Sequence, residues 1–117
     1  MDIRPVDLFS SLSHDTRLRC TLLLLQHDEL CVCELTHAIG AAQPHISRHL
    51  AHLRAAGVIL DRREGLWIHY RINADLPAWA LGVISETRQG VEDRSPFRED
   101  HTALAEMPNR PGTPRCA

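Results

Sequence analysis

The chain contains no lysine, because all 13 of its Lys or Arg residues are arginine. We attribute this absence to the base composition of the genome and not to function. Long hydrophobic runs are absent too: the longest run of large apolar residues, Leu22 to Leu25, is far too short to span a bilayer. Residues 1–12 include Asp2, Arg4 and Asp7 and so lack the apolar core of a signal peptide. We therefore expect a cytoplasmic protein with no membrane partner.

Motifs for common enzyme chemistries are missing as well. The sequence has no phosphate-binding loop, no nucleophile elbow and no paired-carboxylate motif, so we expect neither an enzyme nor a catalytic cofactor. What is present is an ordinary globular composition: 117 residues, of which 24% are charged and 44% hydrophobic. A chain of this length can bury a core as one domain without disulfides, and its composition argues against disorder.

The net charge of −2 hides a gradient along the chain. Residues 1–43 hold three Arg and six acidic residues, residues 44–71 hold five and two, and residues 72–117 hold five and seven. The segment charges are therefore −3, +3 and −2, and the central segment also contains four of the eight His. A local basic patch matters more for binding a polyanion than the total charge does, so residues 44–71 are the candidate contact with nucleic acid.

Hydrophobic spacing predicts helices over most of the first half and a hairpin after them. Helices are expected at residues 5–12, at 16–26 with Ser13 as N-cap, at 32–39 with Gly40 closing the helix, and from Pro44 onward. The period then changes, and residues 58–62 and 67–72 are expected to be strands around a turn at Gly65. A last helix is expected at residues 76–89.

Two helices around a short turn, followed by a hairpin, are the order of a winged helix-turn-helix. The predicted fold class is therefore mainly α with a β-hairpin. Residues 1–90 are expected to form this domain. Residues 91–117 contain several prolines and few large apolar side chains, and are expected to form a flexible C-terminal tail.

The second helix of the pair carries the candidate residues for reading DNA. Ile46, Leu50 and Leu53 share one side at helical spacing and define its inward face. A recognition helix presents its other side to base edges in the major groove, chiefly with its N-terminal half. The candidate DNA-binding residues are Gln43, His45, Ser47, Arg48, His49 and His52 on the helix, with Arg62 and Arg63 on the hairpin. Arg48 is the best suited to guanine, whereas the hairpin arginines suit phosphates. The alternative is a solvated helix face, with His49 partly buried for packing.

Cys31 and Cys33 lie at the start of the first helix of the pair. On a regular helix, residues two apart point about 200° away from each other, so the two sulfurs can meet at one ion only if Cys31 precedes the helix in a non-helical conformation. Thiolates select soft ions, which makes a thiophilic ion a sensible ligand. No second cysteine pair completes a zinc finger, and two buried structural thiols explain the spacing equally well.

Three segments together closely resemble the ArsR/SmtB family of metal-responsive repressors. They are residues 29–35 (ELCVCEL), 43–50 (QPHISRHL) and 61–71 (DRREGLWIHYR), and residues 76–79 (LPAW) are similar to the arsenic-sensing branch. The resemblance covers roughly residues 8 to 90. It implies a homodimer with its first and last helices at the interface, bound to palindromic double-stranded operator DNA. It further implies that arsenite or antimonite, as inducer, releases this repressor from the operator.

The resemblance fails at one metal ligand. In the arsenic-sensing branch, three cysteines in a Cys-Val-Cys-x-x-Cys pattern bind the ion; Cys31 and Cys33 match the first two, but Thr36 stands at the third position. Cys116 is a candidate for the missing ligand, since a flexible tail of about 25 residues spans on the order of 25–30 Å. Cys20 fits a small core side chain better. A solvent or small-molecule ligand is the remaining candidate.

The predicted metal ligands are therefore Cys31, Cys33 and Cys116. His37 could assist zinc or cadmium, although a solvated surface histidine is the simpler interpretation. Zinc-sensing relatives often place Asp and His ligands on the final helix, and residues 76–89 contain no His. Two alternatives stay open: a cadmium- or lead-responsive repressor of the same family, and a repressor switched by oxidation of Cys31 and Cys33.

Overall fold

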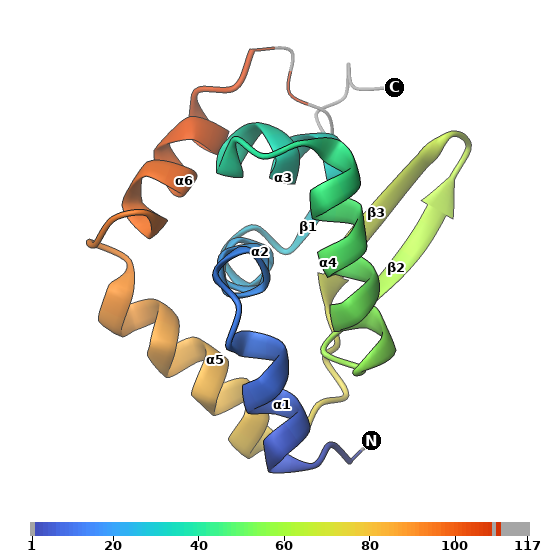
Figure 1. Ribbon diagram of the computed structural model, residues 1–117, viewed down its shortest axis with the longest axis vertical. Helices are drawn as coiled ribbons and strands as arrows, with labels where there is room; N and C mark the ends of the chain where they lie inside the picture. The colour runs from blue at the N-terminus through green and yellow to red at the C-terminus, as the bar shows by residue number, and fades with distance from the viewer. Residues whose placement is uncertain (1, 109, 111–117) are drawn as a thin grey trace.

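The computed structural model describes residues 2–108 and 110. Its elements follow the chain in the order α1 (Pro5–Leu12), α2 (Asp15–His27), β1 (Glu29–Cys31), α3 (Val32–Ile39), α4 (Gln43–Ala55), β2 (Ile59–Glu64), β3 (Trp67–Ile72), α5 (Ala78–Val91) and α6 (Phe97–Ala105). Helix α2 runs through the centre and is seen end-on in Figure 1, with the other helices around it and the β2–β3 hairpin projecting to one side. The predicted winged helix-turn-helix is confirmed.

Helix α2 is the centre of the fold because most of its sides are covered. It contacts α1, α3, α4, α5, α6, β1 and β3, and Leu22 and Leu24 are 5% and 1% exposed. This environment explains why its sequence is apolar on several sides instead of along one stripe. The helix begins after His14, whose Nδ1 accepts a hydrogen bond from the Thr16 N–H at 3.2 Å. The prediction of Ser13 as N-cap is therefore wrong.

Helices α3 and α4 form the predicted helix-turn-helix. Helix α3 ends at Gly40, whose φ of 76° lies in the left-handed region that favours glycine, and whose N–H donates to a carbonyl of the last turn at 2.9 Å. Helix α4 begins at Gln43 and has a proline in its first turn. Its predicted inward face is confirmed, because Ile46, Leu50 and Leu53 are fully buried.

The sheet has three antiparallel strands in the order β1-β3-β2. Strands β2 and β3 form the predicted hairpin, with Gly65 at φ 62° in the turn. The sequence does not predict β1, because a segment of three residues is too short to show the alternation of a strand. Strand β1 forms through its pairing with β3, in which Leu30 lies opposite Tyr70.

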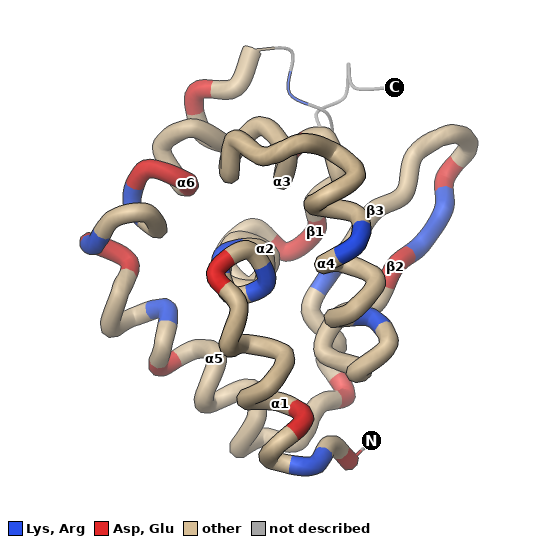
Figure 2. The backbone as a smooth tube through the Cα atoms, in the orientation of Figure 1, with Lys and Arg blue, Asp and Glu red and all other residues tan. Residues whose placement is uncertain are grey.

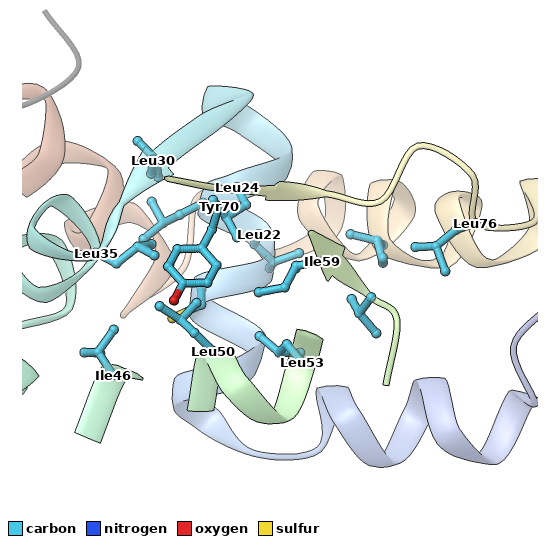
Figure 3. Packing of buried hydrophobic residues seen from close by; sticks show 14 of the residues in the cluster. Leu22, Leu24, Leu30, Leu35, Ile46, Leu50, Leu53, Ile59, Tyr70 and Leu76 are labelled. Carbon is cyan, nitrogen blue, oxygen red and sulfur yellow. The ribbon is translucent and has the colours of Figure 1, made fainter. Parts of the chain in front are cut away.

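The hydrophobic core joins the sheet to the helices. Figure 3 shows Tyr70 of β3 close to Leu24 of α2, Leu35 of α3 and Leu50 of α4, and Leu30 of β1 belongs to the same cluster. Full burial of a leucine side chain contributes about 1.5–3 kcal/mol. These contacts hold α3 and α4 against α2 and the sheet, and so determine which face of α4 is left to solvent. In the part of the chain that the structure describes, none of the helices combines the length and the hydropathy that a membrane span requires.

The C-terminal region differs from the prediction. Helix α5 lies close to the predicted residues 76–89. The flexible tail expected from residue 91 is wrong over Phe97–Ala105, which form α6 with Asp100 and Leu104 buried. Asp100 accepts hydrogen bonds from Arg19 of α2 at 2.6 and 2.8 Å, and α6 also packs against α3 (Figure 1). Because a buried ion pair and few apolar residues anchor this helix, hydrophobic periodicity does not reveal it.

Candidate nucleic-acid interface and thiol pair

The outward face of α4 gathers four of the predicted DNA-binding residues. Gln43, Arg48 and His52 are exposed, and Ser47 is half-buried. The Gln43 amide donates to the Ser47 Oγ at 2.9 Å. Helix α4 contains no acidic residue, and Figure 2 shows basic segments on α4 and on β2. The result is a cationic helix face rich in hydrogen-bonding groups, which suits the major groove of DNA.

His45 is held between α2 and Arg48. Its Nε2 lies 2.9 Å from Oγ1 of Thr16, and its Nδ1 lies 3.1 Å from Nη2 of Arg48. The ring is half-buried and meets the His49 ring edge-on, with 4.6 Å between centroids. Both ring nitrogens of His45 are therefore engaged within the protein.

His49 lies inside the fold and not on the DNA-contacting surface that the sequence predicts. It is 7% exposed, its ring stacks on His14 at 4.1 Å between centroids, and its Nδ1 lies 3.2 Å from Nη1 of Arg17. Burial, and then the neighbouring basic groups, lower the pKa of His49 to about 4. Arg17 also donates to the Ser11 carbonyl at 2.8 Å. The neutral His49 ring thus links α4 to the end of α1.

The two predicted hairpin arginines have different surroundings. Arg62 forms ion pairs with Glu29 of β1 at 2.6 Å and with Glu64 at 3.1 Å. Its hydrogen bonds to Glu29 hold the pKa of that carboxyl below its usual range. Arg63 points to the opposite face of β2, and no carboxylate in the described part of the chain forms an ion pair with it. Arg63 is therefore the more available of the two for a phosphate.

Cys31 and Cys33 come together at the start of α3. Cys31 is the N-cap and has extended backbone angles (φ −86°, ψ 167°), so the conformation required for the two sulfurs to meet is present. Burial, and then a hydrogen bond between the two side chains, raise the pKa of Cys31 well above that of a free thiol. Cys31 is 1% exposed, whereas Cys33 is half-buried. The thiol pair is thus preformed, with Cys31 protonated at neutral pH.

A buried carboxylate supports the thiol pair. Glu34 is 2% exposed, and its Oε1 accepts the Cys31 N–H at 2.9 Å while the Cys31 sulfur accepts the Glu34 backbone N–H, which completes a capping box. Its Oε2 lies 2.6 Å from Nε of Arg110. Arg110 is therefore anchored one side chain away from the thiol pair. Cys116, the predicted third ligand, lies outside the described residues.

The other candidate metal ligands, Cys20 and His37, have surroundings that suit other roles. Cys20 is fully buried, which raises its pKa to about 12 and fits a core side chain. His37 is exposed. Thr36 has its Oγ1 buried without a hydrogen-bond partner among the described residues. Within residues 2–108 and 110, no group of three or more His, Cys, Asp or Glu side chains could hold a metal ion. The described residues therefore supply the thiol pair without a third His, Cys, Asp or Glu side chain placed to share a metal ion with it.

Sequence reasoning missed Thr16, Glu34 and Arg110. The Cys-x-x-Glu spacing parallels the Ser/Thr-x-x-Glu of a capping box and could have indicated Glu34. Thr16 contacts His45, which is 29 positions away in the chain, and Arg110 contacts Glu34, which is 76 positions away. No local sequence pattern therefore marks Thr16 or Arg110.

Known proteins with similar sequences and folds are regulators of transcription. Residues 14–60 match the family model described as bacterial regulatory protein, arsR family. The chain is 46% identical over 118 residues to the arsenic resistance transcriptional regulator ArsR1 of Pseudomonas putida, covering 98% of this chain and 89% of that protein. It is 51% identical over 82 residues to the arsenical resistance operon repressor of Escherichia coli, covering 70% of each. The solved structure of the AntR antimony-specific transcriptional repressor is similar with a TM-score of 0.64 at 32% identity, covering 75% of this chain and 77% of that one.

Proposed function

Because this chain belongs to the ArsR family of bacterial transcriptional regulators, we propose that trivalent arsenic or antimony bound to its cysteines releases it, as a homodimer, from operator DNA in the cytoplasm. Membership of the family makes it a DNA-binding repressor and not an enzyme. The proposal adds the inducer, its ligands, and the homodimer that binds the operator.

The observation that carries the proposal is the meeting of Cys31 and Cys33 at the first turn of α3. Two adjacent sulfurs suit a soft, thiophilic ion, which replaces their protons on binding. Helix α3 packs directly on α4, and the Cys31 sulfur is itself part of the helix cap. Binding at this sulfur therefore perturbs the start of the helix that supports the recognition helix. Release follows if the ion binds the DNA-incompetent state more tightly than the competent one.

For the third ligand we propose Cys116, with Arg110 as the anchor of its tether. The ion pair between Arg110 and Glu34 leaves six residues from the anchor to Cys116, instead of about 25 from the start of the expected tail. Six residues reach at most about 20 Å when extended, which is enough to return to the thiol pair. A short tether raises the effective concentration of the third thiol to the millimolar range.

The homodimer is supported by apolar side chains that face solvent on α1 and α5. Val6 and Phe9 of α1 are 70% and 53% exposed, and Trp79 of α5 is 42% exposed. Large exposed apolar groups on two helices fit a surface that a second copy covers. A two-fold dimer would place its two α4 helices in successive turns of the major groove, matching a palindromic operator.

A switch driven by thiol oxidation has less support. Reactive cysteines are exposed and have a lowered pKa, because the thiolate is the species that reacts with peroxide. Cys31 is almost fully buried, and its pKa is raised. These properties favour binding of an ion that displaces the proton over direct oxidation.

The test is release of an operator duplex, measured by fluorescence anisotropy, on titration with arsenite, antimonite, cadmium and zinc. Cys33→Ser should keep its operator affinity and lose release by arsenite, and Cys116→Ser should require more arsenite. Cys20→Ala serves as the matched control, since it removes a cysteine outside the site and should be released normally. Release of Cys33→Ser at wild-type arsenite concentrations would contradict the ligand assignment. Release by cadmium and not by arsenite would place the chain among cadmium-responsive repressors.

A further inference from the structure

We propose that His45 is a positioning residue that aims Arg48 at the DNA, and that Thr16 holds His45 in the required orientation. The inference rests on the proposed role of Arg48 in reading a base edge. It assigns His45 a task other than direct base contact, and it brings a residue of α2 into operator recognition.

The protonation state of His45 follows from its partners. A guanidinium can only donate hydrogen bonds, so Nδ1 of His45 must accept the bond from Arg48. The neutral ring then carries its proton on Nε2 and donates it to Oγ1 of Thr16. Each ring nitrogen has one fixed role, and the ring cannot turn over without losing both bonds.

Two hydrogen bonds link Thr16, His45 and Arg48 in a row. The end at Thr16 is held rigidly, whereas the end at Arg48 is not. Thr16 is 6% exposed in the first turn of the central helix α2, and the His45 ring rests edge-on against the buried ring of His49. Arg48 is exposed on the outward face of α4. A long, free arginine side chain loses conformational entropy when it is fixed on a base. The hydrogen bond that Arg48 donates to the rigid His45 ring restricts the guanidinium before DNA arrives, so less freedom is lost on binding.

The test is a double-mutant cycle on sequence discrimination. Operator duplexes are first selected from a random pool by the wild-type protein. The measured quantity is the ratio of the dissociation constant for a scrambled duplex to that for the selected one, together with its dependence on salt. The variants are Arg48→Ala, Thr16→Val and the double variant, with Thr16→Ser as the control that keeps the hydroxyl. Thermal unfolding followed by circular dichroism checks that each variant folds.

Arg48→Ala should lower the ratio at least tenfold. Thr16→Val should lower the ratio about three- to tenfold, which is the effect of losing one hydrogen bond. Thr16→Ser should have the wild-type ratio. In the Arg48→Ala background, Thr16→Val should change the ratio by less than about 1.5-fold, because its effect passes through Arg48. Neither Thr16 variant should change the salt slope, since no phosphate contact is lost.

Equal effects of Thr16→Val with and without Arg48 would overturn the inference while leaving the reading of DNA by Arg48 intact. An unchanged ratio in Arg48→Ala would overturn both. If Thr16→Val does not fold, His45→Phe takes its place in the cycle, because it keeps the ring and removes both nitrogens. A wild-type ratio in His45→Phe, or a salt slope lowered by about one, would also refute the positioning role, the latter by revealing a direct phosphate contact.

Discussion

Replacement of Asp100 by Asn should lower the free energy of unfolding by about 2 kcal/mol. Asp100 is buried and accepts two hydrogen bonds from Arg19, at 2.6 and 2.8 Å. Removing one partner of such a buried pair costs about 3–5 kcal/mol, because the other charge is left uncompensated. The loss is smaller here, because Arg19 still donates hydrogen bonds to Asp15 at 3.1 Å and to the Ile39 carbonyl at 3.3 Å. The amide oxygen of the new asparagine can also still accept a hydrogen bond from Arg19. At about 4 °C per kcal/mol for a chain of this size, the midpoint of thermal unfolding should fall by about 8 °C.

Urea unfolding of the wild type and Asp100→Asn at one protein concentration measures this difference, since the homodimer proposed above would make stability depend on concentration. Asp7→Asn is the matched control: Arg4 and Asp7 also form a doubly bonded Arg–Asp pair, at 3.0 and 3.1 Å, but in solvent. Exposed pairs contribute little, so its midpoint should not move measurably. Equal midpoints for wild type and Asp100→Asn would refute the claim that the buried pair anchors α6.

Arg63→Ala should lower the slope of log affinity for DNA against log salt by about one, and Arg62→Ala should lower it less, because two carboxylates already offset the charge of Arg62. The free energy of unfolding should fall as pH falls from 6.5 toward 4, because His49 takes up a proton in the unfolded chain but not in the folded protein, where its pKa is lowered to about 4. Urea unfolding at pH 7 and pH 5 should therefore show a smaller loss of stability in His49→Gln than in the wild type. Arg110→Gln should weaken arsenite binding about two- to threefold in an ultraviolet titration of the metalloid–thiolate band, since the tether to Cys116 then lengthens from six residues to eleven, counted from the end of α6. The same change in a Cys116→Ser background should have no effect.

The helix-turn-helix could be predicted because its signals are local. Ile46, Leu50 and Leu53 recur at helical spacing and are all buried, and Gly40 has the left-handed conformation that ends a helix. Strand β1 and helix α6 could not be predicted, because each depends on a partner far away in the chain. Strand β1 requires β3, and α6 requires the pairing of Asp100 with a residue 81 positions earlier.

The candidate site was predictable in its residue types and less so in their roles. The spacing of Cys31 and Cys33 predicts that their sulfurs can come together only if Cys31 precedes the helix in a non-helical conformation. The structure has this conformation. The burial of His49 and the pairing of Arg62 with Glu29 are tertiary facts that composition cannot show. A local count of positive charge therefore overstates what is free to meet phosphate.

The arrangement of the sheet also determines how copies of this protein can associate. A strand edge with free backbone groups can pair with a strand of another molecule and start aggregation. Here one edge, β1, is only three residues long, and the other, β2, carries four consecutive charged residues, Asp61 to Glu64. Both features discourage edge-to-edge pairing, so the hairpin can project into solvent without seeding fibres. The proposed homodimer would then form through helix faces, which can close a pair of molecules and stop there.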